Sequence, residues 1–141
     1  MTFNQSFILE KLNQIIGHLE ETKKFFRFSD REILADLEKL HIAERLFQLI
    51  VDDMLDINQH FIKELNFDTS DDYQGTFYIL GDNNILPKNF AFKIAPTTGV
   101  RNILVHGYET LDKKLFIKNF KDNYSDFEQY VKLIEKYLKG G

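Results

Sequence analysis

Four residues whose side chains could do chemistry together lie between positions 101 and 108: Arg101, Asn102, His106 and Tyr108. A histidine can remove a proton from one oxygen and deliver it to another, and an arginine can hold two phosphate oxygens with its planar fork. The set therefore suits phosphodiester transfer in RNA, in which a ribose hydroxyl attacks the adjacent phosphate without a metal ion. We expect Arg101 and His106 to be catalytic and Asn102 and Tyr108 to support them.

A helix through this segment would divide its residues between two arcs. The inward arc holds Val100, Ile103 and Leu104, and the outward arc holds Arg101, Asn102, Val105 and His106. An apolar residue in the middle of a polar arc suggests that a second chain covers it, so Val105 predicts a homodimer. Such a dimer would also bring two copies of His106 to one cleft, which provides both an acid and a base. Gly107 offers an exit that leaves His106 in the last turn, where the helix dipole favours a protonated imidazole.

The same residues have a structural interpretation. Arg101 and His106 could form a hydrogen-bond network at an interface, and Tyr108 could be an ordinary packing aromatic. The spacing alone leaves this interpretation open.

The remaining polar residues show no pattern of a catalytic or metal site. We expect His18, His41 and His60 to be structural, because none has a second ligand-type residue at metal-binding spacing. The adjacent acids Glu20–Glu21, Asp52–Asp53 and Asp71–Asp72 point in different directions on a helix, so we expect them to be solvated. Since glycine-rich phosphate loops and metal motifs are also absent from the sequence, we expect no cofactor and no metal.

The composition favours a helical protein. A chain of 141 residues fits one domain, residues 1–141, and 43% hydrophobic residues with 14 phenylalanines suffice for a packed core. With 2 prolines and 7 glycines, the chain has too few turn signals for a β-sandwich, and without cysteine it has no disulfides or thiolate sites. No apolar run approaches a membrane span, so we expect a cytoplasmic protein with no membrane partner.

Charge is distributed unevenly along the chain. Residues 1–87 carry 8 basic and 16 acidic side chains, whereas residues 88–141 carry 10 basic and 6 acidic ones. The net charge of −4 argues against coating nucleic acid through bulk charge, but a polyanion could bind at one local basic site in the second half.

Hydrophobic periodicity predicts an antiparallel bundle of four to five helices. The expected segments are 3–26, beginning at Phe3, then 30–65, 73–80, one that starts near Pro87 and ends at His106, and one from Asp112 to Leu138. Ser29 and Glu32 form a capping-box pattern before the second segment, which is either one long helix or two with a bend near His41. Gly81 and the following turn residues should end the third segment, and Pro96 should interrupt the fourth. Asp112 is the expected N-cap of the last helix.

The spacing R-x4-H-x-Y, with Asn102 after the arginine, resembles the signature of HEPN ribonucleases, specifically the HepT-like toxins. Residues Glu44-Arg45, Gln48, Asp56-Ile57 and His60 resemble the family's second long helix, and Ile85-Leu86-Pro87 the entry to its fourth. The resemblance implies an all-α bundle, a homodimer with the motif at a cleft between protomers, and metal-independent RNA cleavage by Arg101 and His106. It also implies a toxin–antitoxin module in which a minimal nucleotidyltransferase antitoxin silences the toxin by transferring AMP to Tyr108. The alternative is a non-catalytic nucleotide-binding or interaction module that partners such a nucleotidyltransferase.

Overall fold

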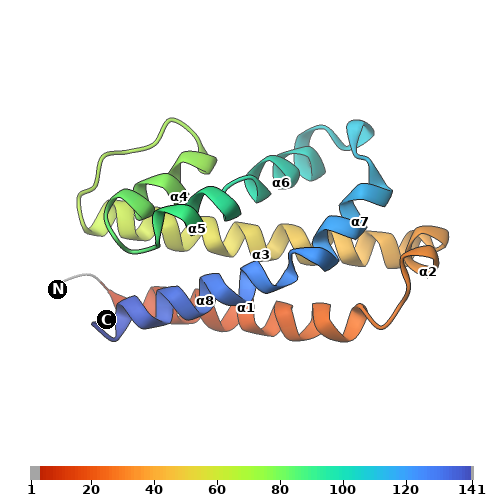
Figure 1. Cartoon of the computed structure of the whole chain (residues 1–141), viewed down its shortest axis with the longest axis horizontal. Coiled ribbons are helices and arrows are strands. Elements are labelled where there is room, and N and C mark those ends of the chain that lie inside the picture. Colours follow the sequence, from red (N-terminus) through yellow and green to blue (C-terminus); the bar gives the residue numbers. More distant parts are fainter. Residues whose placement is uncertain (1–3, 141) are drawn as a thin grey trace.

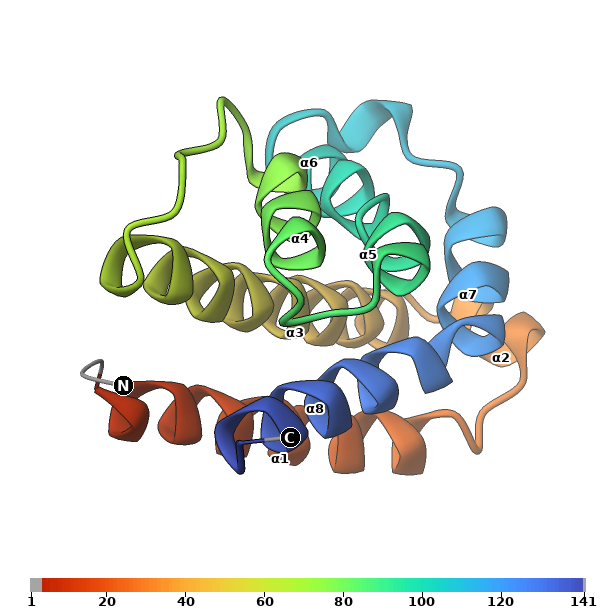
Figure 2. The same ribbon diagram turned by 60° about the vertical axis from the view of Figure 1, so that its left-hand side comes forward.

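The computed structural model describes residues 4–140, which form an all-α bundle around one long central helix (Figure 1). The central helix α3 lies between a layer made by α1 and α8 and a layer made by α4, α5 and α6, as both views show (Figures 1 and 2). The elements are α1 (Gln5–Phe25), α2 (Asp30–Ala35), α3 (Leu37–Glu64), α4 (Tyr73–Asp82), α5 (Lys88–Ile94), α6 (Thr97–His106), the short 3-10 helix η1 (Tyr108–Thr110), α7 (Lys113–Asp122) and α8 (Tyr124–Leu138).

The expected fold class is confirmed, but the number of helices is larger. Three of the five expected segments, at 30–65, 87–106 and 112–138, are each divided into two helices. The described residues therefore form eight α-helices instead of four to five. The first segment is α1, whose N-cap Asn4 accepts a 3.0 Å hydrogen bond from the Ser6 amide, while Phe3 lies outside the described residues.

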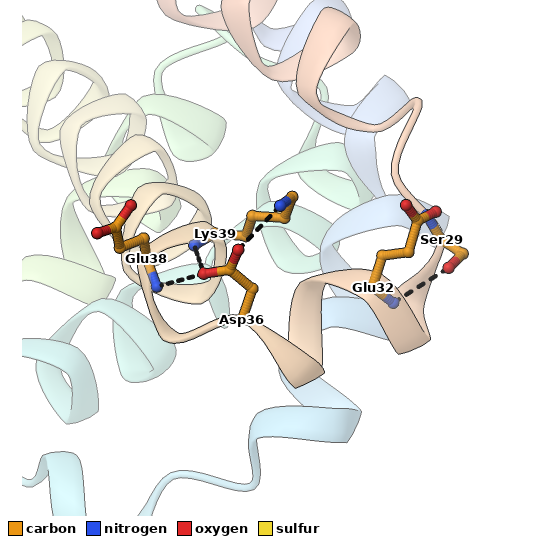
Figure 3. Close-up of polar contacts among 5 residues, drawn as sticks. All are labelled: Ser29, Glu32, Asp36, Glu38 and Lys39. Atoms are coloured by element: carbon orange, nitrogen blue, oxygen red, sulfur yellow. Dashed lines mark hydrogen bonds and ion pairs between the residues drawn. The ribbon is translucent and has the colours of Figure 1, made fainter.

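The second segment starts where the capping box predicts. The Ser29 hydroxyl accepts from the Glu32 amide at 3.1 Å, and the Glu32 carboxylate accepts from the Ser29 amide at 3.0 Å (Figure 3). Together the two bonds satisfy amides that the first turn of a helix leaves without partners.

The bend expected near His41 is wrong in position, because the chain breaks at Asp36. Asp36 has extended dihedrals (φ −125°, ψ 110°), and its carboxylate accepts hydrogen bonds from the amides of Glu38 and Lys39 (Figure 3). An aspartate at the N-cap position stabilises the start of a new helix, whereas histidine is not one of the residue types that favour this position. The break therefore separates a short α2 from a 28-residue α3.

The third segment ends within the predicted turn residues but after Gly81, since α4 continues through Asp82 and Asn83 is its C-cap. A Cβ at position 81 would lie 3.1 Å from the Cβ of Ala91, so the glycine allows α5 to approach α4 closely. Pro87 directly precedes α5, one position earlier than the expected first turn. Pro96 interrupts the fourth segment as predicted, and α6 resumes at Thr97.

The last segment begins at its predicted cap but is not one helix. The Asp112 carboxylate accepts from the Leu115 amide at 3.0 Å, which confirms the N-cap. At Asn123 the backbone leaves the helical region (φ −106°, ψ 12°), and α8 starts at the next residue. The Tyr124 hydroxyl then donates to the Leu19 carbonyl at 2.6 Å, so a contact with α1 accompanies the change of direction.

Aromatic side chains form much of the core. The ring of Phe47 on α3 lies 5.2–5.8 Å, centroid to centroid, from the rings of Phe116, Phe120 and Phe127 on α7 and α8, all in edge-to-face geometry. Such contacts favour one arrangement of the rings over others, so this cluster holds α7 and α8 against the central helix.

A polar network joins three helices inside the core. The Tyr130 hydroxyl donates to Asn58 Oδ1 at 2.6 Å, and Asn58 Nδ2 donates to the Thr76 hydroxyl at 3.1 Å. All three residues are buried, and each hydrogen bond compensates the loss of water. Because the contacts are directional, they set the registers of α3, α4 and α8.

None of the helices formed by residues 4–140 combines the length and the hydropathy needed to cross a lipid bilayer.

Candidate functional site

Helix α6 carries the motif and presents most of it to solvent. Asn102, Val105 and His106 are exposed, with Val105 39% exposed, whereas Val100 and Leu104 pack against the core. The predicted division into two arcs is therefore confirmed for these five residues. Arg101 and Ile103 are half-buried.

Arg101 turns toward the central helix. Its Nε donates to Asp52 Oδ1 on α3 at 2.7 Å, and its Nη1 donates to Asn102 Oδ1 at 3.2 Å. The guanidinium also lies 5.5 Å from the centre of the Tyr73 ring at the start of α4. Among residues 4–140, Nη2 has no acceptor, so the terminal edge of the guanidinium remains able to bind an anion.

The expectation that Asp52 and Asp53 are both solvated is wrong. Asp52 forms the ion pair with Arg101, and its side chain is 32% exposed, while Asp53 is buried beneath α1. The two adjacent side chains do point in different directions, but Asp52 points toward Arg101 and Asp53 toward α1, so neither is fully solvated.

Tyr108 is fixed by a second carboxylate of the central helix. Its hydroxyl donates to Glu44 Oε2 at 2.8 Å, and Glu44 is only 8% exposed. Burial and then the hydrogen bond to Glu44 raise the pKa of Tyr108 to about 12. The Lys113 ammonium lies 5.5 Å from the centre of the same ring. The Tyr108 hydroxyl therefore lies against Glu44.

These two contacts anchor both ends of the motif. Arg101 meets Asp52 and Tyr108 meets Glu44, so α6 runs antiparallel to α3, as Figure 1 also shows. His106 lies between the two anchors and follows Arg101 by five residues, which is about 7.5 Å along a helix axis. No hydrogen bond between His106 and the other three motif residues is present in the described part of the chain, and the histidine remains exposed.

Sequence reasoning missed Asp52, Glu44 and Tyr73 as neighbours of the motif. Glu44 did carry a signal, because it occupies an apolar stripe of α3 together with Leu40, Phe47 and Val51, at spacings of four, three and four residues. A carboxylate on such a stripe needs a partner. Asp52 and Tyr73 carry no comparable signal.

The other three histidines occupy separate places. His18 Nε2 is 3.7 Å from Asp53 Oδ2, His60 stacks on the Phe7 ring at 4.5 Å, and His41 is exposed on α3. Within the described residues, no three His, Asp or Glu side chains converge as a metal site would require.

The buried Asp53 predicts a dependence of stability on pH. Burial raises its pKa to about 6, although Lys11 and His18 oppose the shift, and its Oδ2 accepts no hydrogen bond. The folded-state pKa exceeds the unfolded value of about 3.9, so this group favours folding below that value, and its contribution is lost as the pH rises toward 6.

Asp53→Asn, which resembles the protonated acid, should therefore raise the free energy of unfolding by about 1–3 kcal/mol at pH 8 and change it little at pH 4. Urea titrations at both pH values measure the difference. A variant that is less stable at pH 8 would contradict the prediction. Asp56→Asn is the control, because this neighbouring carboxylate, 3.0 Å from Lys11, has a side chain that is 44% exposed.

Comparison with known proteins agrees with this architecture. The family model described as ribonuclease HepT-like matches residues 15–134. The chain is 34% identical over 139 residues to the tRNA nuclease HepT of Aphanizomenon flos-aquae. The matched region covers 98% of this chain and 95% of that protein. It is 22% identical over 127 residues to the mRNA nuclease HepT of Shewanella oneidensis, covering 90% and 87% of the two chains.

The fold is also found among solved structures. The tri-AMPylated Shewanella oneidensis HEPN toxin in complex with its MNT antitoxin superposes with a TM-score of 0.84 at 19% identity, over 92% of this chain and 97% of that one. At that identity the likeness concerns the fold. The family model covers most of the chain, and it includes the two carboxylates and all four motif residues. This chain belongs to the ribonuclease HepT-like family.

Proposed function

We propose that this chain is a cytoplasmic ribonuclease toxin that cleaves RNA with Arg101 and His106 and requires no metal. The observation that carries the proposal is the Arg101–Asp52 ion pair, on the helix that exposes His106. The pair holds the guanidinium through Nε and leaves Nη2 without an acceptor among the described residues. An arginine held this way is preorganised for a phosphate, because little of its side-chain freedom remains to be lost on binding.

The reaction divides between the two side chains. A histidine removes the proton of the ribose 2′-hydroxyl, the oxygen attacks the neighbouring phosphorus, and an acid protonates the departing 5′-oxygen. Arg101 stabilises the negative charge that develops on the phosphate oxygens, and Asn102, bound to the same guanidinium, helps to orient it. In a homodimer one His106 acts as the base and the partner's His106 acts as the acid.

Incubation of the purified chain with RNA in excess EDTA tests this function. We expect cleavage to continue in EDTA and to leave a cyclic phosphate on the upstream fragment, because the internal hydroxyl is the nucleophile. Relatives that act on tRNA and on mRNA make both RNA classes the appropriate substrates. If neither class is cleaved, with or without divalent ions, the chain is instead a non-catalytic module that accompanies a nucleotidyltransferase.

The dimer makes a separate prediction. Val105→Asp should convert the chain to a monomer, because a charge would replace the apolar contact between protomers at this exposed position of α6. Light scattering at tens of micromolar measures the mass, and the melting temperature should change little, since the position is already exposed. Leu9→Asp on α1, at an apolar residue that is 48% exposed and lies in the layer on the other side of α3, should leave the mass unchanged. A monomeric wild type would overturn the dimer.

Regulation follows from the position of Tyr108. We infer that a minimal nucleotidyltransferase antitoxin silences the chain by transferring AMP to the Tyr108 hydroxyl, as the AMPylated relative in complex with its antitoxin suggests. Tyr108 lies two residues after His106, so an attached phosphate would compete for Arg101 and an adenosine would cover the RNA site.

Tyr108→Phe should keep the fold and most of the RNA cleavage but escape silencing, because it lacks the hydroxyl that accepts AMP. Co-expression with a candidate minimal nucleotidyltransferase antitoxin, followed by mass spectrometry of the toxin, measures the modification. Tyr73→Phe is the matched control at an exposed tyrosine, and it should still be modified and silenced. AMP-sized additions that map to another residue, or none at all, would mean that inhibition comes from direct binding.

A further inference from the structure

Glu44 is a buried acid whose carboxylate faces one particular hydroxyl. It projects from the first third of α3 and is 8% exposed. The hydrogen bond from the Tyr108 hydroxyl, 2.8 Å from Oε2, is the contact that compensates its burial. Within residues 4–140 the carboxylate accepts no other hydrogen bond and forms no ion pair with a lysine or arginine. Among the described residues, the Tyr108 hydroxyl is therefore the group positioned to donate a proton to this carboxylate.

A tyrosine that attacks a phosphate must lose its proton. The neutral phenol is a weak nucleophile, and burial together with Glu44 holds the pKa of Tyr108 near 12, so the phenolate is rare at neutral pH. The proton must therefore leave as the new bond forms, which requires a base within hydrogen-bonding distance of Oη. Glu44 Oε2 meets that requirement at 2.8 Å.

We propose that Glu44 is the general base for nucleotidyl transfer to Tyr108. The inference rests on the AMP transfer proposed above and assigns a residue of this chain to that step. Tyr108 Oη attacks the α-phosphorus of a nucleoside triphosphate that the transferase delivers. The new Oη–P bond forms as the bond from the α-phosphorus to the bridging oxygen breaks, pyrophosphate leaves with the electron pair, and the phenolic proton moves to Glu44 Oε2.

The alternative role for Glu44 is protective, and it predicts the opposite effect of removing the carboxylate. If Glu44 only sequesters the hydroxyl, its loss frees Tyr108 and lowers the pKa of the phenol, so Tyr108 becomes more reactive. If Glu44 is the base, its loss leaves the proton without an acceptor, and Tyr108 becomes less reactive.

Acetylation by N-acetylimidazole measures this reactivity without a transferase. The reagent is small and neutral, and it transfers an acetyl group to a tyrosine oxygen as the phenolic proton is lost and imidazole departs. Peptide mass spectrometry follows each tyrosine separately. Tyr73, 44% exposed, is the internal reference, and Tyr130, which is completely buried, reports unfolding if it becomes labelled.

Glu44→Gln should slow acetylation of Tyr108 by about tenfold or more and leave Tyr73 unchanged. Glutamine has the same shape and still accepts the hydrogen bond through its carbonyl oxygen, but it cannot take the proton. Glu44→Asp retains a carboxylate and should give an intermediate rate. Protection of Tyr130 in all three proteins shows that the core is intact.

An equal or faster rate at Tyr108 in Glu44→Gln would overturn the role of Glu44 as a base. That outcome would leave the proposed AMP transfer standing, since a residue of the transferase could then take the proton. Conversely, a co-expressed toxin that carries no AMP on Tyr108 overturns the proposed regulation, whereas the acetylation result still decides whether Glu44 activates the hydroxyl. The two failures are thus distinguishable.

Discussion

His106→Ala is expected to lower the rate of RNA cleavage by about a hundredfold or more, because general acid–base catalysis typically contributes that much. Arg101→Ala should have an effect of about the same size, since it removes the cation that stabilises charge on the phosphate. Cleavage rates of the purified variants and inhibition of bacterial growth measure both effects. Helix content should not change in His106→Ala, since this side chain is exposed on α6.

The structure supplies a matched control for each variant. His41 and Arg45 are exposed on α3, and within residues 4–140 neither forms a hydrogen bond or ion pair with a motif residue, so alanine at either position should leave cleavage intact. Arg101→Lys should also lose activity, because a lysine has one side-chain nitrogen. It cannot bind Asp52 through one nitrogen and a phosphate through another, as the guanidinium can. Full cleavage by His106→Ala or Arg101→Ala would remove that residue from the mechanism.

Phe47→Ala is expected to lower the free energy of unfolding by about 3–5 kcal/mol, the typical effect of removing a buried phenylalanine. The ring is 5% exposed and contacts three aromatic rings of α7 and α8, so its removal leaves a cavity lined by groups that cannot all move inward. A loss of this size is a large part of the stability of a small domain.

Denaturant titration followed by circular dichroism measures this loss. Phe92→Ala is the control, because its ring is 64% exposed and contacts only the Tyr78 ring, at 4.9 Å, among the described aromatic groups. We expect Phe92→Ala to cost about 1 kcal/mol or less. Similar effects of the two variants would mean that the aromatic cluster around Phe47 contributes little to stability.

The sequence by itself determined the features that depend on neighbouring residues. The helical class followed from the spacing of apolar side chains, and three boundaries followed from side chains that act within one turn: Ser29, Asp112 and Pro96. The outward placement of Asn102, Val105 and His106 is likewise a consequence of helix geometry. Such features are predictable because the groups that cause them are close in the chain.

The tertiary structure decided the features in which local signals compete or in which the partner is remote. Asn123 divided an unbroken heptad pattern, and Gly81, which lies inside α4, allows α5 to pack closely against that helix. Each of these outcomes depends on the direction that a helix must take to pack against the core. Hydrophobic periodicity does not specify that direction.

The chemistry of the site shows the same division. The sequence identified Arg101 and Tyr108, but their carboxylate partners lie 49 and 64 residues earlier in the chain. The sequence predicted a solvated Asp52, and the apolar stripe around Glu44 indicates that this acid needs a partner without indicating which residue that partner is. Only the antiparallel packing of α6 on α3 brings each carboxylate within 3 Å of its motif residue, and that packing results from burial summed over the whole bundle.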